Sequence, residues 1–242
     1  MQHPNGESKE QLDILEHGAP VDGQPQTSDR RLYVQFQAFT GAIGTDDIVA
    51  ALKDSGLDAA LYVDANDPYG IGLVFMTESA DVLVTEVRDL MNSEPFDVLD
   101  HRPELTMLGR SYATGYEPDL DHALVERPKG NVLNPDWPWG IWYPLRRNGA
   151  FAELNHKEQR EILMEHASIG RAYGRAGFAH DVRLACYGLD ANDNDFVIGL
   201  IGEDLYPLSR VVQDMRKTTQ TALYVDSLGP FFVGKKVWQS AS

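Results

Sequence analysis

The tetrapeptide Asp-Ala-Asn-Asp occurs twice in the chain, in DANDPYGIGLV (64–74) and in DANDNDFVIGLI (190–201). The same Ile-Gly-Leu follows each copy, with one extra residue before it in the second. Asp, Asn, Pro and Gly favour tight turns, so each copy is expected to join two paired strands. A hairpin turn that recurs at the same place in both halves of a chain indicates a tandem structural repeat.

The elements predicted around the two turns have the same order in both halves. Hydrophobic periodicity in the first half predicts a strand at 31–39, a helix at 46–55, strands at 59–63 and 71–76, a helix at 80–91 and a strand at 105–116. The second half reads as a strand at 139–145, a long helix at 155–177, strands at 182–189 and 195–201, a helix at 207–224 and a strand at 230–238. Both halves therefore have the β-α-β-β-α-β order of a ferredoxin-like unit.

A ferredoxin-like unit makes an antiparallel sheet that carries helices on one face only. The economical way to cover two bare faces is to pack them together, so we expect an α+β fold in which two tandem ferredoxin-like units form one barrel. The expected parts are a flexible tail rich in polar residues, a first unit, a connecting segment without clean periodicity and a second unit. Their boundaries are 1–29, 30–117, 118–138 and 139–242.

The composition limits the classes of partner. The 242 residues carry a formal net charge of -16, which disfavours nucleic acid and anionic membranes but leaves a small anionic ligand open. The single cysteine, Cys186, cannot form an internal disulfide and fits a reducing cytoplasm, where we expect the protein to reside. The sequence contains no run of about 18 apolar residues, so no membrane-spanning helix is expected.

The long predicted helix, HKEQREILMEHASIGRAYGRAG (156–177), carries a histidine on its apolar face. His166 shares this face with Ile162, Leu163, Ile169 and Tyr173. The short helix at 46–55 has no interior histidine. An unpaired buried imidazole costs about 1–3 kcal/mol, so it needs a partner. The helix pattern alone leaves the partner open between a backbone carbonyl, a water molecule and a metal ion.

The second half also concentrates cationic side chains. The predicted interior-facing set is Arg146, Arg147, Arg171, Arg183 and Arg216. In so acidic a chain, such a cluster indicates an anionic ligand. The alternative is that several of these arginines form surface ion pairs with Asp and Glu.

Three strings together resemble the chlorite dismutase family, which includes the coproheme decarboxylases of haem biosynthesis. They are WYPLRR (142–147), MEHASIGRAY (164–173) and GLDANDNDF (188–196) with DMRKTTQTALY (214–224). The resemblance covers roughly residues 30–238 and is strongest from Trp142 onward. It implies two ferredoxin-like units per subunit, haem b or coproheme in the second unit, and a homo-oligomeric ring, commonly a pentamer.

The resemblance also assigns roles to residues. His166 matches the family's iron ligand in a motif like EHG-x-x-GR-x-Y, with Ala167 in place of the usual Gly. Tyr143 matches the radical-forming tyrosine of the decarboxylases' YP-x-x-K motif, and Leu145 follows it among the cofactor-binding candidates. Arg147 stands where that motif has lysine. It keeps the charge, but a guanidinium does not deprotonate in this range, so the lysine's proton-donor role is in doubt.

Two further sets follow from the resemblance. Arg216 and Thr221 match residues at the porphyrin propionates, and Arg171, also a cofactor-binding candidate, matches the arginine of the decarboxylases' GR pair. The residue on the far side of the iron is not fixed, because the segment from Tyr173 to Gly188 is two residues longer than in the family. Four residues stay open for that place: Ala179, His180, Asp181 and Arg183. His180 would act as a base towards peroxide, and Arg183 would match the arginine of chlorite dismutases.

These residues support several functions. The leading hypothesis is peroxide-dependent decarboxylation of coproheme. A second is chlorite dismutation or a peroxidase-like activity, although the paired tryptophans of chlorite-degrading members have no match here, where Phe151 and Ala152 stand instead. A third is a haem-binding sensor, carrier or scaffold without turnover. A fourth is a family member that binds no haem and uses His166 as an ordinary core histidine.

Overall fold

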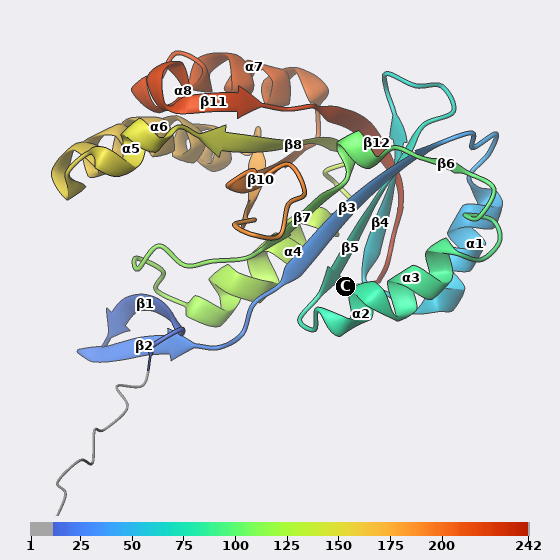
Figure 1. Ribbon diagram of the computed structural model, residues 1–242, viewed down its shortest axis with the longest axis horizontal. Coiled ribbons are helices and arrows are strands. Elements are labelled where there is room, and N and C mark those ends of the chain that lie inside the picture. The colour runs from blue at the N-terminus through green and yellow to red at the C-terminus, as the bar shows by residue number, and fades with distance from the viewer. Residues whose placement is uncertain (1–11, 242) are drawn as a thin grey trace, which may run out of the picture.

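The computed structural model describes residues 12–241 and shows two repeated units in one barrel (Figure 1). The first unit consists of β3 (Tyr33–Thr40), α1 (Asp46–Ser55), β4 (Ala59–Asp64), β5 (Ile71–Thr77), α2 (Asp81–Val84), α3 (Glu86–Met91) and β7 (Met107–Arg110). The second consists of β8 (Trp139–Arg147), α6 (His156–Arg175), β9 (His180–Ala185), β10 (Phe196–Gly202), α7 (Leu205–Met215), α8 (Thr219–Tyr224) and β12 (Phe232–Gln239). The predicted repeat order is confirmed.

The strands of the two units join into a closed sheet. Its order is β10-β9-β7-β3-β5-β4-β12-β8, and β8 pairs again with β10. Within each unit the first strand lies between the fourth and the third, as in a ferredoxin-like unit. The units meet where β4 pairs with β12 and where β7 pairs with β9. The predicted barrel is therefore confirmed.

Aromatic side chains fill the barrel interior and explain the repeated Ile-Gly-Leu. Phe36 lies against both Trp142 and Phe232, with ring centroids 5.7 Å and 4.8 Å apart. A Cβ atom at Gly72 would come within 2.6 Å of the Phe36 and Phe232 rings, and one at Gly199 within 2.6 Å of the Trp142 ring. Each unit thus needs glycine here, because a neighbouring ring occupies the space of a side chain.

Helices cover the outer faces of the barrel. Helices α1 to α3 cover the first unit's sheet, and α5 (Gly149–Glu153) to α8 lie over the second (Figure 1). The remaining elements are β1 (Glu16–Val21), β2 (Gln24–Ser28), β6 (Asp100–His101), η1 (Pro103–Leu105), η2 (His122–Glu126), α4 (Arg127–Val132) and β11 (Val225–Leu228). No helix within residues 12–241 is long and apolar enough to span a bilayer.

The prediction of a flexible tail at 1–29 was wrong for residues 16–28, which form the β1–β2 hairpin. Asp22 and Gly23 both have positive φ, as the Asp-Gly turn of a two-residue hairpin requires. Glu16 anchors the hairpin, since it accepts hydrogen bonds from Arg110 (3.0 Å) and from the backbone of Ala113 (2.8 Å). Residues 1–11 of the predicted tail lie outside the described residues.

Other boundaries differ from the prediction for local reasons. The helix expected at 207–224 is two helices, because Thr218 is extended and its side chain begins α8 as an N-cap. The connecting segment 118–138 contains the π-helical turn η2 and α4. The strand expected at 105–116 is shorter, as β7 ends at Arg110.

Candidate functional site

The candidate site lies between α6 and the outer face of strands β8, β10 and β9. Residues that pair across antiparallel strands point to the same side of a sheet. The register therefore places three rows on the helix-facing side: Ile141–Leu200–Asp181, Tyr143–Ile198–Arg183 and Leu145–Phe196–Ala185. Candidate residues from two strands thus share one face.

Helix α6 lies over this face without packing fully on it. A capping box at Asn155 and Glu158 begins the helix. None of its 20 residues is buried, and only Ile169 and Tyr173 join the apolar cluster between the sheet and α7. Leu163 was predicted on the interior face, but it is exposed. Hydrophobic periodicity predicted the helix correctly, but the prediction overestimated how many of its residues contact the sheet.

His166 lies on the inner side of α6 and is partly buried. Its Nδ1 is 3.2 Å from Oγ1 of Thr218, and no described residue forms a hydrogen bond with its Nε2. Burial first, and then the positive charges of Arg147 and Arg183, lower the pKa of His166 to about 4. The imidazole is therefore neutral at pH 7, as a metal ligand must be.

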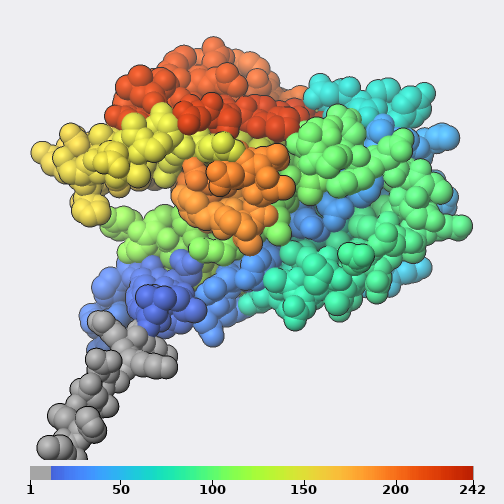
Figure 2. All heavy atoms as spheres, in the orientation of Figure 1, coloured from blue at the N-terminus to red at the C-terminus, as the bar shows by residue number. Residues whose placement is uncertain are grey.

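An apolar floor occupies the end of the sheet near the start of α6. We use this name for the buried cluster of Leu145, Ala185 and Phe196, with partly buried Tyr112 and Ile198 against it. No residue of α6 belongs to the cluster. Figure 2 shows a hollow between the yellow residues of α5 and α6 and the green residues that lead into α4. The floor is thus an apolar, largely buried part of the sheet that packs against residues outside α6.

Tyr143 is buried on the helix-facing side of β8. Its ring stacks on Phe231, with centroids 4.6 Å apart and an interplanar angle of 27°. Burial raises the pKa of its phenol, the charge of Asp181 raises it further, and Arg216 lowers it. Tyr143 therefore remains protonated across the physiological range, in a fixed orientation.

Two arginines lie at the margin of the floor. The guanidinium of Arg147 lies over the rings of Phe151 and Phe196, 4.7 Å from each centroid. Arg183 is on the helix-facing side of β9, where its Nε donates to Asp181 at 2.7 Å. Both charges act on His166, so the structure brings Arg147, Arg183 and His166 into one neighbourhood.

His180 is on the other face of the sheet. It pairs with Ile201, which belongs to the barrel core, and its ring stacks on Trp137 with centroids 3.4 Å apart. The structure therefore does not bring His180 and His166 together. Ala179 is buried in the cluster under α7, so Asp181 and Arg183 are the polar residues of the four open candidates that face α6.

The cofactor-binding candidates Arg171, Arg216 and Thr221 lie at separate points. Arg171 is exposed on α6, and Arg216 is exposed at the end of α7, where its charge acts on Tyr143. Thr221 is in the first turn of α8, and its backbone N–H donates to Oγ1 of Thr218 at 3.5 Å. Arg216 and Thr221 thus border the site, whereas the side chain of Arg171 forms no hydrogen bond or ion pair within the described part of the chain.

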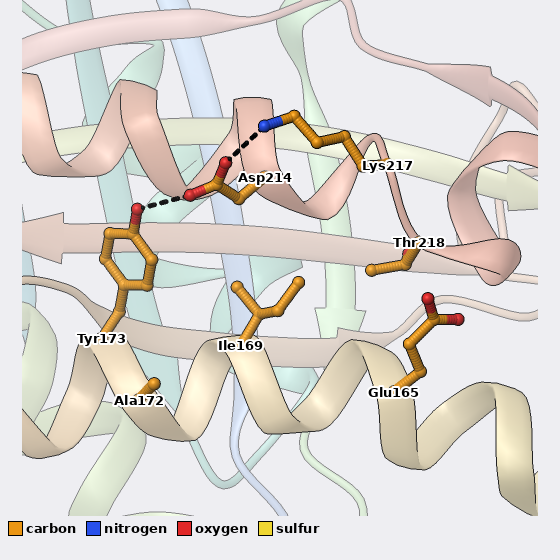
Figure 3. A pocket seen from close by; sticks show the side chains of 7 residues that line it. All are labelled: Glu165, Ile169, Ala172, Tyr173, Asp214, Lys217 and Thr218. Atoms are coloured by element: carbon orange, nitrogen blue, oxygen red, sulfur yellow. Dashed lines mark hydrogen bonds and ion pairs between the residues drawn. The ribbon is translucent and has the colours of Figure 1, made fainter.

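A groove of about 360 Å³ separates α6 from α7 (Figure 3). The hydroxyl of Tyr173 donates to Asp214 across it at 2.9 Å, and Lys217 pairs with the same carboxylate at 2.9 Å. The hydrogen bonds from Lys217 and Tyr173 lower the pKa of Asp214 to about 2. This bridge holds α6 against α7 and thereby fixes the helix that carries His166.

Two residues of the site could not be found from the sequence pattern. Thr218 contacts His166 from 52 residues away, in the turn between α7 and α8. Tyr112 follows β7 in the first unit and joins the apolar floor of the second, with its ring centroid 5.7 Å from that of Phe196. In the sequence, Tyr112 is distinguished only as an aromatic residue just beyond a strand. Such residues are too common for the pattern to single it out.

Because His166 is held neutral, the stability of the fold should decrease as the pH falls. Its folded pKa, about 4, lies below the ordinary 6.5, so only the unfolded chain takes up this proton as the pH falls between those values. The free energy of unfolding should lose on the order of 1–2 kcal/mol from this group between pH 7 and pH 5. Denaturant unfolding of wild type and His166→Gln measures it.

The wild type is expected to lose more stability over this interval than His166→Gln. The matched control is His156→Gln, an exposed histidine at the start of the same helix, which should keep the wild-type pH dependence. An equal loss in wild type and His166→Gln would show that the imidazole is not held neutral.

The fold and the site define a barrel of two ferredoxin-like units with one histidine-centred site on the second unit. A family model described as chlorite dismutase matches residues 66–237, more than two thirds of the 242 residues. The chain belongs to the chlorite dismutase family.

Solved structures of similar fold agree with this assignment. A heme-binding protein from Thermus thermophilus has 17% sequence identity and a TM-score of 0.66, over 87% of this chain and 92% of that one. A putative chlorite dismutase has 12% identity and a TM-score of 0.66, over 86% and 96%. A mutant chlorite dismutase from Candidatus Nitrospira defluvii has 14% identity and a TM-score of 0.61, over 85% and 91%. A comparison with curated proteins finds no match.

Proposed function

We propose that the chain binds an iron porphyrin through Nε2 of His166 and catalyses the peroxide-dependent decarboxylation of coproheme. Membership of the chlorite dismutase family supports the cofactor class, as do the similar structures described as heme-binding and as chlorite dismutase. The observation that carries the proposal is a neutral His166 with no hydrogen-bond partner on Nε2 among the described residues, on a helix that lies over the face of the sheet that carries Tyr143 and Arg183.

The residues present fit such a group. A neutral imidazole is a common axial ligand of porphyrin iron. Leu145, Phe196 and Ile198 give the helix-facing side of the sheet the apolar character that a flat macrocycle would need. Arg147, Arg216 and Thr221 at the border would hold carboxylates, and Arg171 would add a further charge if a propionate reaches it. Among residues 12–241 no group of three or more His, Cys, Asp or Glu side chains is placed to hold a metal ion, so His166 is the single protein ligand proposed.

An iron porphyrin held by His166 would activate hydrogen peroxide, which is the oxidant of the reaction. For each propionate, the reaction converts the side chain and one peroxide into a vinyl group, carbon dioxide and two water molecules. Tyr143 is buried, protonated and fixed by its stack on Phe231, so we assign it the relay of an electron from the propionate. Arg147 keeps a positive charge at the site and cannot exchange a proton, so we assign it carboxylate binding only.

Incubation of the protein with coproheme and hydrogen peroxide tests this function. Mass spectrometry of the porphyrin should show two successive losses, each of one carbon dioxide and two hydrogen atoms. A porphyrin whose mass is unchanged although it binds with a His166-dependent Soret band would contradict the decarboxylase activity.

Chlorite dismutation or a peroxidase-like activity is the second candidate, because Arg183 is on the helix-facing side of β9 in the same row as Tyr143. An arginine there would bind an oxyanion, although Asp181 holds its guanidinium. Oxygen evolution from chlorite, lost in Arg183→Gln, would support this candidate. A protein that binds haem and shows neither activity would be a carrier or sensor.

We further infer from family membership that the chain assembles as a homo-oligomeric ring, with five subunits as the expected number, in the cytoplasm. The net charge of -16 keeps nucleic acid and anionic membranes unfavourable as partners. Multi-angle light scattering measures the number of subunits, and a monomer at micromolar concentration would contradict the ring.

A further inference from the structure

Thr218 lies directly beside the imidazole of His166 and is almost fully buried, with 1% of its surface exposed. It occupies the turn between α7 and α8, and its Oγ1 is 3.2 Å from Nδ1 of His166. A threonine hydroxyl has one proton to donate and two lone pairs that accept. The direction of this contact therefore depends on where the hydroxyl proton goes.

The hydroxyl proton of Thr218 is directed to a backbone carbonyl. Oγ1 donates to the carbonyl oxygen of Met215 at 2.8 Å, which is shorter than its contact with His166. Towards His166, Oγ1 then acts as the acceptor, so Nδ1 must carry the imidazole proton. In a neutral imidazole this leaves the lone pair on Nε2, the nitrogen that no described residue contacts.

The backbone fixes the position of this hydroxyl. Thr218 is the N-cap of α8, where its Oγ1 also accepts from the N–H of Thr221 at 3.5 Å. Its own N–H donates to Met215 at 3.1 Å, and its carbonyl accepts from Ala222 at 2.9 Å. Rotation of the hydroxyl away from His166 would disturb the start of a helix, so the contact is part of the local fold.

The acceptor beside His166 carries no charge. The neighbouring carboxylate, Glu165, accepts a hydrogen bond from the backbone N–H of Thr219 at 3.0 Å instead. Figure 3 shows Glu165 and Thr218 on facing elements at one end of the groove between α6 and α7. Within residues 12–241 no carboxylate is hydrogen-bonded to the imidazole of His166.

We propose that Thr218 is the positioning residue that holds His166 as the Nδ1-protonated tautomer and, because its hydroxyl is uncharged, keeps the imidazole a weak electron donor to a bound metal. The second half of this statement rests on the proposed iron-porphyrin function, whereas the first half does not. A charged acceptor at this place would raise the basicity of the ligand and stabilise the oxidised iron.

The tautomer is tested on the protein alone. Long-range ¹H–¹⁵N spectra of ¹⁵N-histidine-labelled protein, assigned by loss of one spin system in His166→Gln, should show protonated Nδ1 and unprotonated Nε2. Thr218→Ser should keep this pattern, and Thr218→Val should lose it. A wild-type His166 protonated on Nε2 would overturn the proposal.

The electronic effect is tested on the haem-loaded protein by its reduction potential and by the iron–histidine stretching frequency in resonance Raman spectra. Thr218→Asp supplies a charged acceptor and remains a good N-cap for α8. The Thr218→Asp variant should favour the oxidised iron on the order of tenfold, which lowers the reduction potential by about 59 mV. It should also raise the iron–histidine stretching frequency. An unchanged potential and frequency would overturn the electronic half of the proposal.

Asp204→Ala is the matched control for loss of fold. Asp204 caps α7 through a hydrogen bond from the N–H of Tyr206 and does not contact His166. This variant should lower stability without moving the potential. If the protein binds no porphyrin at all, the tautomer result on the free protein still stands, so failure of the proposed function and failure of this inference are distinguishable.

Discussion

His166→Ala is expected to weaken coproheme binding by at least about 100-fold and to abolish the ligand-induced Soret shift. The variant removes the single protein ligand proposed for the iron. Loss of a residue that only hydrogen-bonds to a metal ligand typically costs about 10–100-fold in metal affinity, and loss of the ligand itself should cost more. The fold should persist, because none of the residues of α6 is buried and His166 belongs to no core cluster. Titration of the protein with coproheme, followed in the Soret region, measures the affinity.

The control for this variant is His156→Ala, which removes an exposed histidine ten residues earlier on the same helix. It should bind coproheme as the wild type does. Added imidazole should restore part of the Soret shift in His166→Ala, since the vacated volume faces the site. Equal binding by wild type and His166→Ala would leave His166 as an ordinary histidine of the fold.

Tyr143→Phe is expected to slow decarboxylation on the order of 100-fold or more while coproheme affinity changes by less than about threefold. The variant removes only the hydroxyl and keeps the ring that stacks on Phe231. A loss in the chemical step without a loss of binding is the signature of a group that acts in the transition state. Single-turnover mass spectrometry separates the chemical step from binding.

Tyr62→Phe is the matched control, because Tyr62 is also fully buried and its hydroxyl has no hydrogen-bond partner. It lies in the barrel core, away from α6, so its loss should leave the rate unchanged. Decarboxylation by Tyr143→Phe at the wild-type rate would remove Tyr143 from the mechanism and leave the porphyrin site intact.

The sequence predicted the architecture because the determinants of the barrel are local and repeated. The two Asp-Ala-Asn-Asp turns fixed the hairpins, and Gly72 and Gly199 hold the same place beside interior rings. The Asp22–Gly23 turn of the N-terminal hairpin was an equally local signal, but the polar composition around it masked it. Composition indicates only whether a segment has enough apolar residues to form a core. This hairpin does not need a core of its own, because the hydrogen bond from Arg110 to Glu16 attaches it to the barrel.

The site was predictable only in part, because its geometry depends on pairing between distant segments. The sequence singled out His166 and Tyr143, but four residues at the start of β9 and just before it stayed open until the register with β10 placed Arg183 and Asp181 on the helix-facing side. Hydrophobic periodicity also does not give the distance between a helix and a sheet, so the sequence did not predict that α6 contributes no residue to the apolar floor. Thr218 joins His166 through a turn between two helices that the sequence pattern predicted as one.

A crystal structure of the protein with coproheme bound tests the central claim most directly. We expect Nε2 of His166 to be bonded to the iron while Nδ1–H donates to Thr218. We also expect Tyr143 and Arg183 to face the porphyrin from the sheet. A porphyrin bound elsewhere, or an iron held by any residue other than His166, would contradict it.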